Sequence, residues 1–586
     1  MIQESIKKFG DKTAMRYKEG RQWKSISYRE FGEKIRATAK ALLEEGISEG
    51  DMVGIFSQNR PEWAIADFAI LSIKAVSVPI YATNTAKQAE YIAGDADLKI
   101  IFAGDQIQYL KVKSFIETQK QLRKIITLDG KIELTGNDSI SMEKFMEKGR
   151  KSSRDAEVEA KTAAGEGDDI ATLIYTSGTT GDPKGAILTH ANLFSQFHAL
   201  DVRFDVGVSD RSLCFLPLSH AYERAWSYYI FRCGAENSYV LNPKDIVTFM
   251  PEVKPTCMVS VPRLYEKIYS TVFDKLQKAS PAQKKIFHWG LGAGREYAFK
   301  KKDNKMIGPV LKIKHALADK LILSKIRDVV GGPKNFFSAG GAPLSKEIEE
   351  FFFSAGLLVC QGYGLTETSP MISCNSPKAF KFGTVGKPIL GCEVRIGEAG
   401  EIQARGPNIM KGYYKKPEAT QETFVDGWFK TGDVGFIDED GFLVITDRIK
   451  DLIITAQGKN VAPQHIEMIV GKDHYIEQIV TIGDKRKYIS ALIVPVFASL
   501  EQYARENKIA FASREDLVKN PAIIDFFSNR IKEVSAELPN YERIIRFTLI
   551  SHEFTQDAGE LTPTMKIRRK VIAEKYRDLI DKMYSA

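Results

Sequence analysis

Between residues 27 and 102, short apolar runs alternate with helical signals, and this alternation constrains the fold most strongly. Ser27 and Glu30 have the spacing of a helix capping box, and apolar positions then recur at helical intervals. Strand-like runs follow at 53–56 and 76–81, with helical sequence between them. Such alternation is typical of a largely parallel sheet covered by helices on both faces. We therefore predict an α/β fold.

The chain has 586 residues, more than one compact core usually holds. Residues 148–169 are polar and charge-rich, which favours a surface connection between elements. The pattern changes after about Asp447, where shorter helices and strands suggest a small α+β unit. The sequence thus predicts two domains: a large N-terminal part with helix-covered β-sheets, residues 1–446, and a smaller C-terminal domain, residues 447–586.

Composition excludes several classes of protein. Apolar residues make up 44% and charged residues 27%, and 83 basic against 75 acidic residues give a formal charge of +8. This mild excess fits anionic ligands and does not demand nucleic acid. The six cysteines form no CxxC pair, so neither a zinc site nor a disulfide framework is expected. The beginning lacks the apolar core of a signal peptide, and the apolar stretch 64–82 is interrupted by Asp67, Lys74 and Pro79. We expect a cytoplasmic protein.

The run Tyr175–Gly185, with the sequence YTSGTTGDPKG, contains the strongest chemical signal. It follows an apolar strand and precedes another apolar run. Glycines allow close backbone approach, hydroxyls donate hydrogen bonds, and Lys184 adds a cation, as a loop that wraps a polyphosphate requires. The alternative is a flexible surface turn. The loop is not a Walker A motif, because Gly181-Asp-Pro-Lys184 breaks the Gly-Lys-Ser/Thr spacing.

Further motifs follow in order, and together the set resembles the adenylate-forming superfamily of acyl-CoA synthetases, luciferases and peptide-synthetase adenylation domains. The motifs are SAGGAP at 338–343, QGYGLTET at 361–368, GWFKTGD at 427–433, DRIKD at 447–451, GKN at 458–460 and TPTMKIR at 562–568. The resemblance covers nearly the whole chain. It implies activation of a carboxylic acid by ATP as an acyl-adenylate, followed by transfer of the acyl group to coenzyme A.

The resemblance also implies which residues bind ATP. These are Thr176, Ser177, Gly178, Thr179, Thr180, Gly181, Lys184, Gly340, Gly341, Ala342, Gln361, Gly362, Tyr363, Gly364, Thr366, Asp433 and Arg448. Within this set Tyr363 would stack on adenine, Asp433 would accept from both ribose hydroxyls, and Arg448 would support the nucleotide.

Three residues are expected to be catalytic: Lys566, Glu367 and His220. By resemblance, Glu367 and Thr176 would hold Mg²⁺ on the phosphates, and Lys566 would bridge the attacking carboxylate and the α-phosphate. His220 would lie near the acyl carbonyl, although a helix-capping role is the alternative. Met565 stands where many members have glycine before the lysine, and long-chain members resemble this sequence more closely there.

The two half-reactions need different groups beside one carbonyl, so the resemblance implies a mobile C-terminal domain. It would rotate about a hinge at Asp447, removing Lys566 and bringing the coenzyme A side, Gly458, Lys459 and Asn460, to the acyl group. This is a hypothesis of gating by domain rotation.

Three segments are similar to long-chain acyl-CoA synthetases: 78–83, 216–224 and 261–267. We therefore expect a long-chain fatty acid as substrate, with Trp226 as a candidate lining of the acyl tunnel or a core residue. Residues 295–327 hold ten basic and three acidic residues with interleaved leucine and isoleucine. Peripheral contact with anionic lipid on the inner membrane face is one hypothesis for this stretch, and a solvated helix face is the other.

Two alternatives stay open at this point. An acyl carrier protein could replace coenzyme A as acceptor, because both present a pantetheine thiol. A non-catalytic acyl- or nucleotide-binding relative could also retain the fold. The intact residues Lys184, Glu367, Asp433 and Lys566 argue against the second. The sequence gives no oligomeric state.

Overall fold

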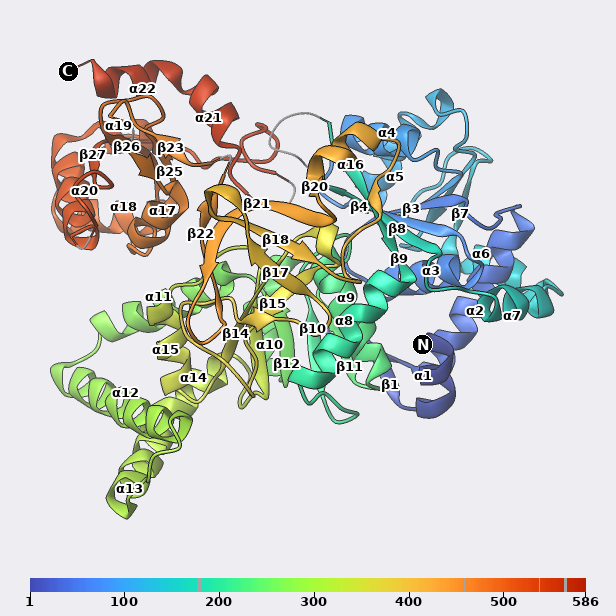
Figure 1. The fold of residues 1–586 in the computed structure, drawn as a ribbon, viewed down its shortest axis with the longest axis horizontal. Coiled ribbons are helices and arrows are strands. Elements are labelled where there is room, and N and C mark those ends of the chain that lie inside the picture. Colours follow the sequence, from blue (N-terminus) through green and yellow to red (C-terminus); the bar gives the residue numbers. More distant parts are fainter. Residues whose placement is uncertain (177–181, 450, 458, 537, 563–565, 586) are drawn as a thin grey trace. The chain divides into compact units, whose positions relative to one another are not determined.

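The computed structural model describes residues 1–176, 182–449, 451–457, 459–536, 538–562 and 566–585 (Figure 1). The chain forms two compact units. Unit 1 comprises Met1–Val394, Ala404–Phe429 and Gly441–Leu443, and unit 2 comprises Arg395–Gln403, Lys430–Asp440 and Val444–Ala586. The domain boundary at Asp447 stays a prediction; unit 2 also includes two segments that precede it.

Unit 1 contains an eight-stranded sheet in the order β19-β9-β8-β4-β3-β5-β6-β7. The strands are β3 (Met52–Ser57), β4 (Val76–Tyr81), β5 (Ile100–Ala103), β6 (Lys124–Thr127), β7 (Ser139–Ser141), β8 (Ile170–Thr176), β9 (Lys184–Thr189) and β19 (Gly412–Tyr413). Neighbours from β8 to β7 are parallel, whereas β9 and β19 are antiparallel additions at one edge. Every residue of β3 is buried, as expected for a central strand covered on both faces. The predicted α/β fold is confirmed.

Two more sheets belong to unit 1. The first has the order β12-β13-β14-β15-β16, and the second has the order β10-β11-β1-β2. Their strands are β12 (Cys257–Ser260), β13 (Phe336–Ala339), β14 (Val359–Gly364), β15 (Met371–Cys374), β16 (Lys387–Pro388), β10 (Arg211–Cys214), β11 (Glu236–Tyr239), β1 (Thr13–Glu19) and β2 (Gln22–Ser27). Residues of a third sheet are divided between the units: β17 (Glu393–Ile396), β18 (Glu401–Arg405), β21 (Trp428–Ile437), β20 (Phe424–Val425) and β22 (Leu443–Arg448).

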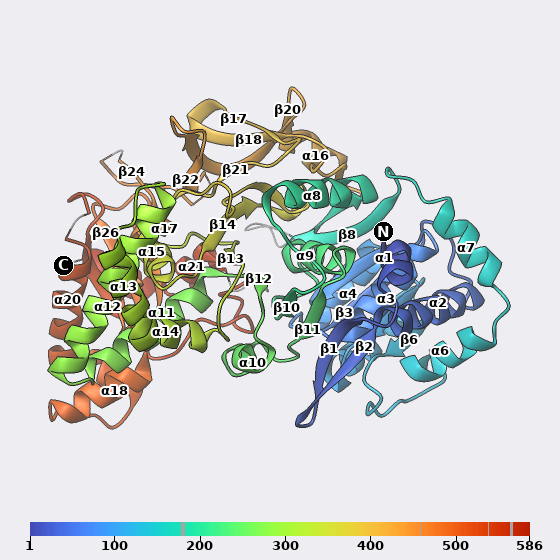
Figure 2. The same cartoon turned by 90° about the horizontal axis from the view of Figure 1, so that it is seen from below.

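The helices of unit 1 pack around these sheets (Figures 1 and 2). They are α1 (Ile2–Phe9), α2 (Tyr28–Glu44), α3 (Pro61–Ser72), α4 (Ala86–Asp95), α5 (Gln106–Lys113), α6 (Met142–Lys151), α7 (Asp155–Ala163), α8 (His190–Arg203), α9 (Ala221–Arg232), α10 (Ile246–Val253), α11 (Pro262–Gln277), α12 (Pro281–Lys302), α13 (Pro309–Ala318), α14 (Ser324–Val329), α15 (Lys346–Ser354) and α16 (Pro417–Thr423). The capping box of Ser27 and Glu30 is confirmed at the start of α2.

The surface connection predicted for 148–169 lies at the surface and contains the end of α6 and the whole of α7, a helix that the sequence did not indicate. Within α7 only Val158 is buried, so the segment has too little apolar periodicity to be recognised from sequence. Ion pairs of Asp155 with Arg36 and Lys40 join α7 to α2. Each partly exposed ion pair of this kind contributes little to the stability of the fold, but the pairs specify where the helix packs.

Unit 2 contains a three-stranded sheet in the order β25-β26-β27, comprising β25 (Ile476–Ile482), β26 (Ile489–Pro495) and β27 (Ile544–Leu549). Its helices are α17 (Pro463–Val470), α18 (Phe497–Glu506), α19 (Arg514–Lys519), α20 (Pro521–Val534), α21 (Arg569–Lys575) and α22 (Arg577–Tyr584), and β23 (Ile453–Ile454) pairs with β24 (Asn460–Val461). Buried residues of β25, β26 and α20 form one apolar core. The C-terminal α+β unit is therefore confirmed as a fold.

All six cysteines are free thiols, and five of them are buried. In the part of the chain that the structure describes, no helix is long and apolar enough to cross a bilayer.

Candidate active site

The glycine-rich loop connects two antiparallel strands. β8 ends at Thr176 and β9 begins at Lys184, and these two residues are register partners. Ser177, Gly178, Thr179, Thr180 and Gly181 lie outside the described residues. A Walker A loop leads from a strand into a helix, so this hairpin agrees with the exclusion made from sequence.

The carboxylate expected to bind magnesium lies beside a tyrosine that the sequence did not identify. Glu367 lies in the 3-10 turn η4 (Thr366–Thr368) and is 8% exposed. Its Oε1 accepts a 2.8 Å hydrogen bond from the phenol of Tyr413 on β19. The ammonium of Lys184 lies 5.2 Å from the centre of the Tyr413 ring. Tyr413 therefore contacts both the cation of Lys184 and the buried carboxylate of Glu367.

The electrostatics of this group keep the tyrosine protonated. Burial, with the adjacent Glu367 charge, raises the pKa of Tyr413 above its ordinary value. The same two causes raise the pKa of Tyr81, at the end of β4. Tyr413 therefore remains a hydrogen-bond donor to Glu367 across the physiological pH range.

The described residues contain no group of three or more His, Cys, Asp or Glu that could hold a metal ion. Magnesium in nucleotide sites usually takes one or two carboxylates and draws its other ligands from phosphates and water. One buried carboxylate at Glu367, with the hydroxyl of Thr176 at the start of the loop, fits that pattern. These two residues would hold the ion, which would withdraw charge from the phosphate oxygens.

The SAGGAP motif at 338–343 begins in β13 and continues beyond it, where Tyr222 from α9 shapes the chain. The Tyr222 phenol shares a 2.7 Å hydrogen bond with Ser338 Oγ. A Cβ on Gly340 would lie 3.0 Å from the Tyr222 ring, and Gly341 has a φ of +84°. Ala342 follows at an exposed position. Glycine is thus required here for close approach and for left-handed backbone.

The next motif lies on β14 and the turn after it. Gln361 uses its amide to bind the backbone of Leu344 in both directions, at 2.9 and 3.2 Å, so its side chain positions the neighbouring loop. Tyr363 is 8% exposed and pairs with Ser373 on β15. The other predicted residues of this motif are Gly362 and Gly364, which lie on β14, and buried Thr366, which lies in η4.

His220 is the N-cap of α9. Its Nδ1 accepts the backbone N–H of Tyr222 at 3.2 Å, so the capping alternative is correct for this nitrogen. Asn59 donates to Leu216 O and accepts from Leu218 N–H, which fixes the segment before the cap. Buried Glu223 accepts from Leu216 N–H, and burial raises its pKa to about 8. Trp226 is a core residue that donates to Ser212 Oγ.

A fully buried ion pair connects α9 to α3, and a hydrogen bond from the same arginine connects α9 to β8. Arg224 Nε lies 3.0 Å from Asp67 on α3, and Tyr228 also bonds to Asp67. Arg224 Nη1 donates to Thr172 Oγ1 at 2.7 Å, and Thr172 lies on β8. Removing one partner of such a pair leaves an uncompensated buried charge. The network therefore holds α9 and β8 in one arrangement.

In unit 2, two predicted nucleotide residues are brought together. Arg448 on β22 forms a 2.8 Å ion pair with Asp433 on β21. Asp433 is 4% exposed, whereas the Arg448 side chain is about one-third exposed. The arginine orients the aspartate that is expected to accept from ribose.

The residue expected to be the hinge is buried and incompletely bonded. Asp447 Oδ1 accepts from Arg448 N–H at 2.6 Å, while Oδ2 is buried and has no hydrogen-bond partner among the residues described. Burial raises the pKa of Asp447 to about 6, with Asp451 and Glu467 adding to the rise. Arg569 pairs with Glu467 at 2.6 and 2.9 Å and partly offsets this effect.

Lys566, the expected catalytic lysine, is hydrogen-bonded to Thr562. Lys566 N–H donates to Thr562 Oγ1 at 3.0 Å, and Lys566 O accepts from Thr562 N–H at 2.8 Å. The Lys566 side chain is exposed. On the coenzyme A side, Lys459 lies 5.9 Å from the centre of the Tyr541 ring and Asn460 begins β24, while Gly458 lies outside the described residues.

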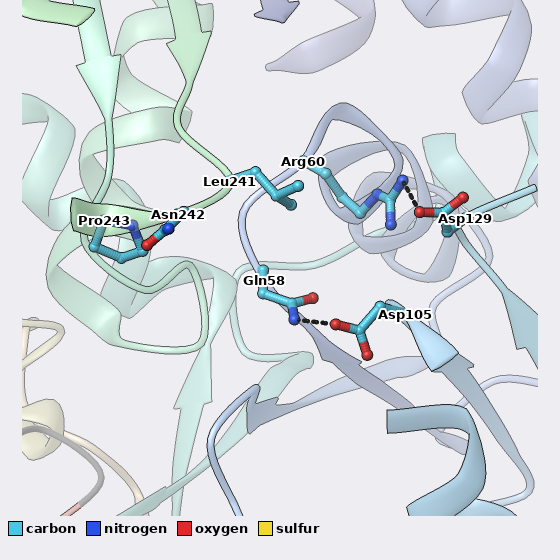
Figure 3. Close-up of a pocket in the computed structure, with 7 residues that line it drawn as sticks. All are labelled: Gln58, Arg60, Asp105, Asp129, Leu241, Asn242 and Pro243. Carbon is cyan, nitrogen blue, oxygen red and sulfur yellow. Dashed lines mark hydrogen bonds and ion pairs between the residues drawn. The ribbon is translucent and has the colours of Figure 1, made fainter. Parts of the chain in front are cut away.

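A pocket of about 290 Å³ in unit 1 lies apart from these motifs (Figure 3). It is lined by Gln58, Arg60, Asp105, Asp129, Leu241, Asn242 and Pro243. Gln58 donates to Asp105 at 2.6 Å, and Arg60 pairs with Asp129 at 3.9 Å. None of the predicted site residues lines it.

Two family models match most of the chain, and related proteins match it over almost its full length. The family model for the AMP-binding enzyme matches residues 2–414, and that for the AMP-binding enzyme C-terminal domain matches residues 450–586. The long-chain-fatty-acid–CoA ligase FadD15 of Mycobacterium bovis is 38% identical over 96% of this chain and 93% of its own length. Long chain acyl-CoA synthetase 7, peroxisomal, of Arabidopsis thaliana is 32% identical over 96% of this chain and 81% of its own.

Solved structures share the fold at lower identity. The anthranilate CoA ligase AuaEII in complex with anthranoyl-AMP matches with a TM-score of 0.72 and 18% identity, covering 98% of this chain and 96% of that one. ATP-bound MatB from Rhodopseudomonas palustris matches with a TM-score of 0.69 and 22% identity, over 99% of both chains. With both family models matched and full-length relatives above 30% identity, the chain belongs to the AMP-binding enzyme family.

Proposed function

We propose that this chain is a long-chain fatty-acid–CoA ligase. It converts a fatty acid and ATP into acyl-AMP and pyrophosphate, and then transfers the acyl group to coenzyme A with release of AMP. The observation that carries the proposal is the likeness, over almost the full length of both chains, to enzymes named for this reaction. The Lys184–Tyr413–Glu367 group supports it with a cation and a carboxylate beside one loop.

In the first half-reaction a fatty-acid carboxylate oxygen forms a bond to the α-phosphorus, and the bond from that phosphorus to pyrophosphate breaks. Two anions approach each other in this step, so the site must supply positive charge and alignment. Lys184, at the end of the glycine-rich loop, binds the phosphates, and Lys566 bridges the carboxylate and the α-phosphate. Glu367, with Thr176, would hold a magnesium ion, which would withdraw charge from the phosphate oxygens.

Three residues bind the nucleotide in this proposal. Tyr363 stacks on adenine beside the Ser338–Pro343 segment, and Asp433 accepts from the ribose hydroxyls. Arg448 orients Asp433 through their 2.8 Å ion pair.

In the second half-reaction the thiol sulfur of coenzyme A attacks the acyl carbonyl, and AMP leaves with the oxygen that joined carbonyl and phosphorus. Lys566 must be withdrawn and the Gly458–Asn460 segment presented, by rotation about Asp447. The part-buried ion pair of Glu467 and Arg569 lies beside Asp447 and supports a switch point there, because packed elements have discrete arrangements rather than continuous ones.

His220 lies near the acyl carbonyl in this proposal. The protein works in the cytoplasm, with residues 295–327 contacting the anionic inner face of a membrane.

The test is release of pyrophosphate and AMP with ATP, magnesium and fatty acids of increasing length. Each acid is supplied with coenzyme A, with holo acyl carrier protein, or with neither. Turnover that requires coenzyme A and is greatest with long acids supports the proposal. Turnover only with carrier protein changes the acceptor, and ATP binding without pyrophosphate release refutes the activity.

A further inference from the structure

Helix α13 carries a row of apolar side chains that face solvent. Met306 precedes the helix and is 91% exposed; Val310, Ile313 and Leu317 follow on α13, and Leu321 lies in the turn after it. The spacing of three and four residues places the helical members on one side. In Figure 1, α13 lies at the lower end of the α12–α14 segment, beyond α12.

The opposite side of the helix already has a partner. Leu311 and Ala318 are buried, and His315 stacks on Tyr297 of α12 with ring centres 3.9 Å apart. Next to the turn, a Cβ on Gly290 of α12 would lie 2.9 Å from Ile322. Packing against α12 therefore fixes the rotation of α13, so the apolar row stays outside the core.

The stretch of sequence that contains the row is rich in positive charge. Residues 295–327 contain ten basic and three acidic side chains, an excess of seven in a chain whose whole formal charge is +8. Arg295, Lys300, Lys305, Lys314 and Arg327 pair with carboxylates. Lys301, Lys312, Lys320 and Lys325 are exposed and form no ion pair with any residue that the structure describes. Lys312 and Lys320 each immediately precede a member of the row.

We propose that α13 lies in the headgroup layer of an anionic bilayer, with Val310, Ile313 and Leu317 inserted between acyl chains. Met306 and Leu321 extend the inserted row at its two ends. The unpaired lysines reach lipid phosphates from its flanks, as long basic side chains do at such interfaces. This proposal deepens the membrane contact proposed above and rests on the proposed function, because a long-chain acid partitions into bilayers and would be taken up there.

A bilayer fits this surface better than a second copy of the chain. Self-association through the row would bring two segments of excess charge seven together, which like-charge repulsion opposes. An anionic lipid surface instead neutralises each unpaired lysine while its hydrocarbon layer takes the apolar row.

Two variants, tested by vesicle flotation, separate the contribution of the inserted apolar side chains from that of the lysines. Vesicles are made of phosphatidylcholine alone or mixed with phosphatidylglycerol, at low and at high salt. The Ile313→Ser/Leu317→Ser variant should bind mixed vesicles roughly tenfold or more weakly, because two inserted side chains are lost. The Lys312→Gln/Lys320→Gln variant should bind about tenfold more weakly at low salt and lose most of its salt dependence.

A matched control comes from α5. Ile107 and Leu110 are three residues apart and 60% and 55% exposed, close to the 65% and 53% of Ile313 and Leu317. Ile107→Ser/Leu110→Ser should bind vesicles as the unchanged protein does. Equal thermal unfolding of all variants checks that the substitutions leave the fold intact.

Activity is measured separately. With a short acid in solution, the Ile313→Ser/Leu317→Ser variant should turn over at the unchanged rate, and with a long acid held in vesicles it should be slower. Vesicle binding without turnover of any acid would refute the proposed function and leave the membrane surface intact. Indifference of the unchanged protein to both vesicle types would overturn the proposal, as would equal binding by Ile313→Ser/Leu317→Ser. An oligomer without lipid that this variant dissociates would assign the row to self-association instead.

Discussion

Replacing Tyr413 with phenylalanine removes the hydroxyl that donates to Glu367 and keeps the ring on which Lys184 lies. The lost hydrogen bond measures 2.8 Å and ends on a carboxylate that is 8% exposed, where water replaces it poorly. A hydrogen bond to a charged group contributes about 1.5–3 kcal/mol. If the whole contribution orients Glu367, the carboxylate proposed to hold magnesium, adenylation should slow by roughly 10- to 150-fold.

The assay is fatty-acid-dependent exchange of pyrophosphate into ATP, measured across a magnesium titration. Tyr413→Phe should need more magnesium for half-maximal exchange, because a loosely oriented Glu367 binds the ion less well. Tyr414→Phe removes a hydroxyl from the next residue and should behave as the unchanged protein. In the Glu367→Gln background, Tyr413→Phe should add little, since both changes remove one interaction.

An unchanged magnesium requirement in Tyr413→Phe would refute this reasoning. So would full additivity of the two substitutions, because it would mean that Tyr413 acts independently of Glu367.

Three further predictions follow from individual sites. Gly364→Ala places a Cβ 1.8 Å from the carbonyl oxygen of Pro370 and should lower the free energy of unfolding by about 2 kcal/mol or more in a denaturant titration. Gly362→Ala, whose Cβ has its nearest contact at 3.5 Å, should change that free energy little. Equal losses of stability in the two variants would contradict the steric argument. The pKa of Asp447 rises from 3.8 to about 6, so the charged carboxylate destabilises the folded protein above that pH and the effect disappears as pH falls toward the lower value. Asp447→Asn should therefore unfold at a higher temperature than the unchanged protein at alkaline pH, with a difference that vanishes in acid; a pH-independent difference would rule this out. Lys566→Ala should slow pyrophosphate exchange by about 100-fold or more. The same variant should form thioester from supplied acyl-AMP at a rate within a few-fold of the unchanged protein. Equal losses of rate in the two assays would mean that Lys566 acts in both steps.

Much of the fold was predictable because its strands are short apolar runs. The runs at 53–56 and 76–81 became β3 and β4. Helix α7 was missed because it buries only Val158 and so lacks a periodic apolar face. Local pattern predicts an element only where burial repeats at a regular spacing.

The site was predictable as a set of motifs and less so as a set of contacts. Tyr413 reaches Glu367 through the two-residue strand β19, which pairs with β9 across a long stretch of sequence. Tyr222 on α9 likewise reaches Ser338 on β13. Long-range packing creates such neighbours, and one sequence contains no signal for it. One residue that the motifs assign to the nucleotide has a structural contact instead. The amide of Gln361 binds the backbone of Leu344.

The central claim, that acyl transfer proceeds through an adenylate, is tested most directly with a fatty acid carrying ¹⁸O in both carboxylate oxygens. If a carboxylate oxygen attacks the α-phosphorus and coenzyme A then attacks the carbonyl, the AMP released gains one ¹⁸O and the acyl-CoA keeps the other. Mass spectrometry of the purified AMP should show this single label. Unlabelled AMP, or ¹⁸O in inorganic phosphate with ADP as product, would contradict the account.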